Sequence, residues 1–286
     1  MSQDFRLDNV GMVNREKKIS FKFNGKKYFG FEGDTIASAL IANGVHLVGR
    51  SFKYHRPRGF FGVGVDEPYA ILQLDRNNER DPNIRATEQE IFEGLEVKSV
   101  HCWPSVNFDI GAINNFLKMF FPAGFYYKTF MWPPSFWYKI YEPFIRMAAG
   151  FGEASIKHDK ERYEHKYEYC DLLITGSGPS GLASAYAAAK NGARVILAED
   201  KPRFGGSLLT SDVNIGNQTG VEWTEKIIAE LKSMPNVTVK NRSQVFGYYD
   251  HNMLVMSERI SDHLPKTQKY LPKQRLWYIR ANEVLI

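Results

Sequence analysis

The residues with the clearest chemical purpose are three glycines that directly follow a short apolar run. Residues 169–175 have the length and composition of a strand, and the segment 176–181 reads Gly-Ser-Gly-Pro-Ser-Gly. Gly176 permits a sharp turn, Gly178 lets the backbone approach a pyrophosphate, and Gly181 lets the next helix pack close to the strand. The start of that helix offers free amides and a positive dipole end to phosphates. We therefore predict a dinucleotide-binding turn.

The residues after this turn make the prediction more specific. An alanine-rich helix over 182–190 is followed by a second strand over 194–198, which ends on Glu199. A carboxylate at this distance can accept hydrogen bonds from a ribose diol and repels a 2′-phosphate. The pattern favours NAD or FAD over NADP, and it leaves the choice between NAD and FAD open.

A glycine pair shortly after Glu199 extends the candidate site. Gly205-Gly206 resembles the pair that lies against the nucleotide in flavoproteins with two dinucleotide-binding domains, although an ordinary loop would also explain it. The predicted cofactor-binding residues are Gly176, Ser177, Gly178, Pro179, Ser180, Gly181, Glu199, Asp200, Gly205, Gly206, Ser207 and Val245.

Other reactive side chains show no catalytic pattern. His55, with Arg56 and Arg58, could contact an anion such as a flavin phosphate, but we expect the arginines to fix the loop or to bind a neighbouring subunit, because a basic loop usually makes ion pairs. His251 and His263 have no serine or cysteine nucleophile in a recognisable context, so we expect structural roles. Cys170 is expected to be an inert core thiol, no metal-ligand spacing appears, and the catalytic residues stay unknown.

Around the glycine turn, residues 168–286 are expected to form a Rossmann-type domain. An amphipathic helix at 224–234, a strand at 237–239, a hairpin around Asp250-His251-Asn252, and strands at 276–279 and 283–286 complete the pattern. The sequence ends on a strand, so we expect this domain to be incomplete and the natural chain to continue.

The first part of the chain, residues 1–106, is expected to form a ferredoxin-like β-grasp domain. Alternating apolar residues at 18–31 surround Asn24-Gly25, which is typical of a two-residue hairpin. Asp34 and Thr35 are helix-start residues, Asn43-Gly44 is a helix end, and 70–74 is a further strand. The combination of α+β and α/β parts predicts two different domains.

The segment between these domains, residues 107–167, has a different composition. Phe, Tyr, Trp and Pro crowd residues 107–152, and lysines and prolines interrupt them too often for a membrane-spanning helix. We expect an extended aromatic arm that packs either on another protein or on its own chain, and the two possibilities carry equal weight. The charged residues 153–167 indicate a linker or an exposed helix.

Composition excludes several classes of protein. The net charge of +5 comes from basic residues scattered among acidic ones, which gives no evidence for nucleic-acid or membrane binding. The amino terminus lacks the apolar block of a secretory signal, and two cysteines cannot build a disulfide scaffold or a four-cysteine site. Both observations fit a cytoplasmic protein.

Several motifs resemble the amino-terminal part of sarcosine oxidase alpha subunits. They are Ser51–Gly59, Gly62–Pro68, Tyr249–Asn252, Glu258-Arg259, Asp262–Leu264 and Gln274–Trp277. The resemblance spans most of residues 17–286. The sequence differs from the related large subunits of hydrogen cyanide synthase and opine oxidase. Some of those subunits carry cysteines in the ferredoxin-like domain, whereas this sequence has none before His101.

This resemblance implies the function of a larger assembly. The family is a heterotetramer with beta, gamma and delta subunits that oxidises sarcosine to glycine and hydrogen peroxide and passes the methylene group to tetrahydrofolate. It implies NAD bound by this chain, FAD and FMN elsewhere in the complex, and a folate-binding domain absent here. The present chain alone would not be catalytic. A redox-inert assembly module with a structural nucleotide, and a large subunit of a related FAD-dependent amine, opine or cyanide-forming dehydrogenase, are the alternatives.

Overall fold

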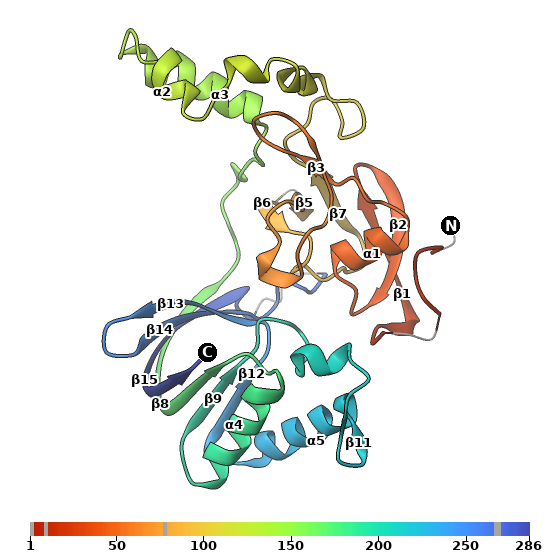
Figure 1. The fold of residues 1–286 in the computed structure, drawn as a ribbon, viewed down its shortest axis with the longest axis vertical. Coiled ribbons are helices and arrows are strands. Elements are labelled where there is room, and N and C mark those ends of the chain that lie inside the picture. The colour runs from red at the N-terminus through yellow and green to blue at the C-terminus, as the bar shows by residue number, and fades with distance from the viewer. Residues whose placement is uncertain (1–2, 9–10, 77–78, 266–269) are drawn as a thin grey trace. The chain divides into compact units, whose positions relative to one another are not determined.

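The chain divides into two compact units, which are described one by one. A computed structural model describes residues 3–8, 11–76, 79–265 and 270–286. Unit 1 comprises Met1–Asp159 and unit 2 comprises Lys160–Ile286 (Figure 1). Among the described residues, every helix is too short or too polar to cross a lipid bilayer.

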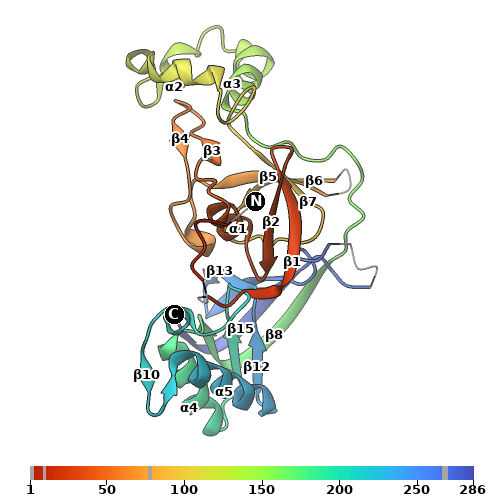
Figure 2. The same cartoon turned by 90° about the vertical axis from the view of Figure 1, so that its right-hand side faces the viewer.

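Unit 1 is built on a five-stranded mixed sheet with the strand order β2-β1-β7-β5-β6. Its strands are β1 (Asn14–Phe23), β2 (Lys26–Glu32), β5 (Ile71–Arg76), β6 (Glu79–Arg85) and β7 (Leu95–Ser99). Two shorter strands, β3 (Gly49–Arg50) and β4 (Pro57–Arg58), pair with each other. Strand β1 is antiparallel to β2 and parallel to β7, and helix α1 (Ile36–Ala42) packs on one face of the sheet (Figure 2). This is the β-grasp architecture that the sequence predicts.

The turn residues and the helix-capping residue predicted for this unit take the expected conformations. Asn24 and Gly25 have φ values of 50° and 78°, so they form the tight turn between β1 and β2. Thr35 caps α1 by accepting a hydrogen bond from the Ser38 amide. The helix buries Ile36, Ala37, Ala39, Leu40 and Ala42. Ile41 of the same helix is exposed.

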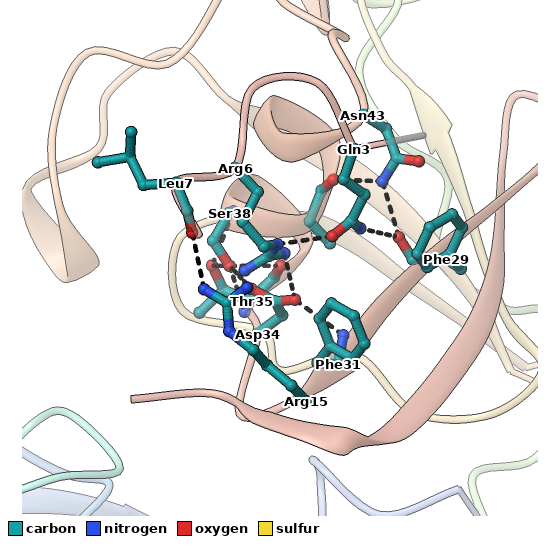
Figure 3. A network of polar contacts seen from close by, with 11 residues as sticks. Gln3, Arg6, Leu7, Arg15, Phe29, Phe31, Asp34, Thr35, Ser38 and Asn43 are labelled. Carbon is teal, nitrogen blue, oxygen red and sulfur yellow. Dashed lines mark hydrogen bonds and ion pairs between the residues drawn. The ribbon is translucent and has the colours of Figure 1, made fainter. Parts of the chain in front are cut away.

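A buried carboxylate joins the amino-terminal segment to this helix (Figure 3). The Asp34 carboxylate is fully buried and pairs with the Arg6 guanidinium at 2.6 Å. It also accepts hydrogen bonds from the Phe31 amide and the Ser38 hydroxyl. Gln3 continues the network, since it accepts a bond from Arg6 and donates one to the Phe29 carbonyl. Gln3 and Arg6 are thereby held against β2 and the start of α1.

The aromatic arm, defined as residues 107–152, is not extended. It consists of short helical segments: the 3-10 helices Ile110–Asn115 and Lys118–Phe120, α2 (Phe125–Thr129), a π-helical turn Trp137–Tyr141, and α3 (Glu142–Ala149). Both views place α2 and α3 together at one end of unit 1, away from the sheet (Figures 1 and 2). The prolines limit the length of each helix but do not prevent helical turns, which is why the prediction of an extended arm was wrong.

Unit 2 contains a six-stranded sheet with the order β12-β9-β8-β15-β14-β13. Its strands are β8 (Tyr163–Thr175), β9 (Val195–Ala198), β12 (Val237–Lys240), β13 (Ser243–Tyr249), β14 (Met253–Arg259) and β15 (Gln274–Leu285). Strands β12, β9, β8 and β15 are parallel to one another, whereas β13, β14 and β15 form an antiparallel meander. Strand β8 starts within the segment that was expected to be a linker or helix.

The two helices of unit 2 follow their strands as a Rossmann fold requires. Helix α4 (Pro179–Lys190) and helix α5 (Gly220–Ser233) share an apolar core with β8 and β9 on one face of the sheet. A second core, with Leu254, Met256 and Trp277 from β14 and β15, packs with Cys170, Leu173 and Ile196. The two separate strands expected at 276–279 and 283–286 are a single strand, because β15 runs unbroken beside β8.

Candidate nucleotide site

The glycine turn has the geometry that each of its three glycines was expected to provide. Gly176 takes a φ of 97°, which favours glycine, and its amide donates to the Ala198 carbonyl at 2.7 Å. A Cβ atom on Gly181 would lie 2.1 Å from the Gly176 carbonyl oxygen. A Cβ on Gly178 would meet no atom within 4 Å. Gly181 therefore closes the strand against the helix, whereas Gly178 borders open space where a ligand can approach.

Helix α4 starts beside that open space. Gly178 is its N-cap residue, and Pro179 occupies the first turn, where a missing amide hydrogen costs nothing. Pro179 and Ser180 are exposed. A helix of 12 residues presents its positive dipole end here. This end of the helix can bind a pyrophosphate, because the helix geometry leaves its first amides free of intrahelical partners.

Glu199 is buried at the end of β9 and joins the two sides of the turn. Its carboxylate accepts hydrogen bonds from the Ser177 amide at 2.9 Å, from the Ser177 hydroxyl, and from the Lys201 amide at 3.1 Å. An ionised carboxylate can accept about four hydrogen bonds. Glu199 thus fixes the glycine turn, and these three donors together with the Asp200 hydrogen bond described below fill its acceptor capacity until Asp200 loses its proton. The Ser177–Glu199 contact is a feature that the motif did not predict.

Asp200 adds a second carboxyl group at the same place. Burial raises its pKa, and the hydrogen bond to Glu199 and the negative charge of Glu199 raise it further, to about 6. Burial also raises the pKa of Glu199, but the hydrogen bonds from Asp200, Ser177 and Lys201 outweigh it and hold that pKa below its ordinary value. The opposite directions of the two shifts place the proton on Asp200 and the negative charge on Glu199 when the pair holds one proton.

The structure brings most of the predicted residues together. Gly205 donates its amide to the Ser177 carbonyl and hydroxyl oxygens, and a Cβ on Gly206 would lie 3.0 Å from the Gly178 Cα. Ser207 follows in an exposed turn. Val245 differs from the others, because its side chain packs against the second apolar core of unit 2, the one that contains Leu254 and Trp277. The binding roles of all these residues stay predictions.

The basic loop is occupied by contacts within unit 1. The His55 ring lies 2.7 Å from Asp109, the Arg56 guanidinium donates to Asn115, and Arg58 lies over the Tyr69 ring. These contacts hold the loop within unit 1, and the binding of an anion or of a neighbouring subunit by these residues stays a prediction. Among the described residues, no three His, Cys, Asp or Glu side chains come together as a metal site. Cys170 is buried, and burial raises its pKa to about 11.

A buried carboxylate organises the loop between β4 and β5. Glu67 is 1% exposed, and its two oxygens accept four backbone hydrogen bonds from Phe61, Gly62, Tyr69 and Ala70, at 2.7–2.9 Å. Burial raises the pKa of Glu67, but the four amides together outweigh it and hold that pKa below its ordinary value. Sequence reasoning missed this residue, although a glutamate between Gly62 and Pro68 was part of a motif already noted.

Comparison with known proteins first defines the class. Residues 16–102 match the family described as 2Fe-2S iron-sulfur cluster binding domain, and residues 171–254 match the family FAD dependent oxidoreductase. The chain thus combines a ferredoxin-type domain with a dinucleotide-binding domain of the flavoprotein oxidoreductase class. The structure of L-proline dehydrogenase from P. horikoshii shares this fold, with a TM-score of 0.55 and 16% identity over 97% of this chain and 42% of that one.

The relatives then narrow the class. The chain is homologous to sarcosine oxidase alpha subunits: it is 49% identical to that of Rhizobium meliloti over 99% of its own length, and 28% identical to that of Corynebacterium sp. strain U-96 over 96%. It spans 29% and 24% of the length of these two relatives. An opine oxidase subunit of Agrobacterium tumefaciens is 31% identical over 28% of this chain and 17% of its own length.

The iron-sulfur cluster suggested by the first family does not fit the residues present. A ferredoxin-type [2Fe-2S] cluster is held by four thiolate ligands, and residues 16–102 contain a single cysteine, Cys102. Burial and the neighbouring Asp109 raise the pKa of the Cys102 thiol to about 11. The ferredoxin-like fold is therefore present without the ligands that would hold a cluster.

We expect the purified protein to lack the iron and the visible absorption of a cluster. Iron and acid-labile sulfide should be far below stoichiometric after anaerobic purification, and supplying iron and sulfide should not change this. A plant-type ferredoxin treated in parallel is the control for cluster loss. Stoichiometric iron and sulfide in this chain would contradict the expectation.

Proposed function

We propose that this chain is the NAD-binding portion of the alpha subunit of a sarcosine oxidase complex. The observation that carries the proposal is the glycine turn, in which Gly178 borders open space at the start of α4 and Glu199 lies at the end of the neighbouring strand. Homology to sarcosine oxidase alpha subunits supports the choice of complex. The nucleotide-binding portion itself is expected to orient a cofactor rather than to act on sarcosine.

The other parts of the proposal follow from the same homology. The complex would include beta, gamma and delta subunits, with FAD and FMN bound outside the part of the chain described here, and would oxidise sarcosine to glycine. The methylene group would pass to tetrahydrofolate on another domain, and hydrogen peroxide would form. We propose that the complex works in the cytoplasm.

The residues present fit a dinucleotide with an unmodified adenosine ribose. The amides at the start of α4 would hold the pyrophosphate, and Glu199 would accept from the ribose diol. Bound NAD would supply a nicotinamide for hydride transfer or serve as a structural ligand. The carboxyl group of Asp200 lies beside Glu199, so a 2′-phosphate would meet two acidic groups. This arrangement favours NAD over NADP.

Calorimetry on the full-length chain in its assembled complex tests this selection. NAD should bind about 100-fold more tightly than NADP, because a like-charge contact at a binding site costs several kcal/mol. At pH 7.5, Glu199→Gln should reduce the ratio of the NAD affinity to the NADP affinity. Glu222→Gln is the matched control, since Glu222 caps α5 instead. Equal affinities for the two cofactors in the unmodified protein would refute the role of Glu199, and no binding of NAD would refute the proposal.

A further inference from the structure

The aromatic arm carries a large set of exposed apolar side chains. Among the arm side chains whose exposure the structure describes, ten are more than half exposed: Phe108, Ile113, Phe116, Met119, Phe120, Met131, Trp132, Tyr138, Phe144 and Met147. Soluble proteins rarely leave contiguous apolar patches larger than a few hundred Å² without an interaction partner. The arm is therefore a candidate interaction surface, and the remaining questions are whether it has a fixed shape and what it binds.

A buried polar cluster fixes the start of the arm. The Asp109 side chain is fully buried, and its carboxylate lies 2.7 Å from the His55 ring and 3.6 Å from the Arg50 guanidinium. Asp109 also accepts hydrogen bonds from the Trp103 and Gly111 amides. A Cβ on Gly111 would overlap the His55 ring, so this segment packs tightly against the basic loop. The first helical turn of the arm is thereby held in place.

The middle and the end of the arm are held through backbone carbonyls. The Tyr54 hydroxyl donates to the Phe121 carbonyl at 2.7 Å, and the Lys53 ammonium donates to the Pro122 carbonyl at 3.1 Å. At the end of α3, His101 contacts the Ala149 carbonyl through Nδ1 at 2.6 Å. These contacts use polar atoms of the arm rather than its ten exposed apolar side chains. A surface fixed in this way loses little conformational entropy on binding.

The charges on the arm have one predominant sign. Its exposed charged residues are Lys118, Lys128, Lys139 and Arg146. The two acids do not balance them, because Asp109 is buried and Glu142 pairs with Arg146 at 3.3 Å. A binding partner of matching chemistry therefore has an apolar centre and acidic groups at its rim.

We infer that the arm is the docking surface for a separate subunit of the complex, whose matching face is apolar and edged by Asp and Glu. This inference rests on the proposed function only in that the chain works in a multi-subunit enzyme. An anionic lipid surface fits less well. Aromatic and methionine side chains, which make up most of the exposed apolar set, are enriched at the cores of protein interfaces, and protection by lipid is one outcome of the test below.

Methionine oxidation tests which molecule covers the arm. Met119, Met131 and Met147 are 86%, 61% and 71% exposed, and Met256 is fully buried. In the isolated full-length chain, the three arm methionines should be converted to sulfoxides by dilute peroxide, with Met256 spared. In the assembled complex their oxidation should slow about tenfold. Protection already present in the isolated chain, protection by anionic phosphatidylserine vesicles but not by the other subunits, or no protection at all would each overturn the inference.

Charge reversal tests the acidic rim. The triple variant Lys118→Glu, Lys128→Glu, Lys139→Glu should bind the other subunits at least about tenfold more weakly at low salt, and 1 M salt should remove most of the difference. The variant Lys157→Glu, Lys160→Glu, Lys226→Glu carries the same change in net charge on exposed residues outside the arm. It should behave as the unmodified chain. If both triple variants weakened subunit binding equally, or if neither weakened it, the proposed acidic rim of the partner would be contradicted. NAD affinity, measured in parallel, tests the proposed function independently.

Discussion

Replacing Glu67 by alanine should lower the free energy of unfolding of unit 1 by about 3–5 kcal/mol, because four backbone amides would lose their shared acceptor. All four donors lie on one loop, two before Glu67 and two after it. The side chain is buried, so water cannot replace the carboxylate without opening the loop. Urea denaturation followed by far-ultraviolet circular dichroism measures the loss.

The matched comparison is a carboxylate in a more exposed position. Glu93 is exposed and accepts from the Ser20 amide and hydroxyl, so Glu93→Ala should cost less than about 1 kcal/mol. Glu67→Gln keeps one acceptor oxygen and should fall between these two variants. A loss for Glu67→Ala no larger than that for Glu93→Ala would contradict the role of Glu67 in organising the loop.

The sign of the pH dependence follows from the direction of the shift. The pKa of Glu67 lies below its ordinary value of 4.5 in the folded protein. A group with a lowered folded pKa contributes stability that is fully present above the ordinary value and is lost as the pH falls through the folded value. The difference between the unmodified protein and Glu67→Gln should therefore be constant at neutral pH and shrink below about pH 4.5.

Two neighbouring glycines should respond to substitution in opposite ways. Gly178→Val should leave the fold intact, since a Cβ there meets no atom, but should weaken NAD binding at least about 100-fold by obstructing the pyrophosphate. Gly181→Ala should destabilise unit 2 by about 3 kcal/mol, because its Cβ would overlap the Gly176 carbonyl. Thermal unfolding and calorimetry on the full-length chain separate the two effects.

Two further variants calibrate this comparison. Gly178→Ala adds a single carbon to the same open space and should weaken NAD binding less than valine does, again with no loss of stability. Ala183→Ser changes an exposed position on the same helix and should alter neither property. Unchanged NAD occupancy in Gly178→Val would show that the nucleotide binds elsewhere, and a fully stable Gly181→Ala would show that helix and strand are not in close contact.

Most of the nucleotide-binding fold could be predicted because its signals are local. Glycine at 176 and 181, an apolar run before them and an acid after the next strand are adjacent in sequence, and the backbone geometry at each glycine matches its expected purpose. The hairpin at Asn24-Gly25 and the helix capped by Thr35 were confirmed for the same reason.

The contacts that sequence reasoning missed join residues that are far apart or use backbone partners. Asp109 and His55 are separated by 54 positions, and no pattern in either segment indicates the other. Glu67 accepts hydrogen bonds from backbone amides, which every residue except proline has. The sequence therefore does not indicate which residues are its partners. Strand β15 was divided in two, because Arg280 and Asn282 interrupt the apolar residues of a strand that is buried only in part.

The pairing of β15 with β8 affects how unit 2 folds during synthesis. Strand β8 lies at the start of the unit, yet the neighbour that pairs with it from Tyr163 to Ile174 is β15, which begins at Gln274. Residues more than 100 positions apart must meet to complete the sheet, and contacts of this kind form slowly. On the ribosome, β8 would therefore leave the exit tunnel well before its partner and wait with an unpaired edge. The nascent chain is most exposed to misfolding and to chaperone binding in this interval.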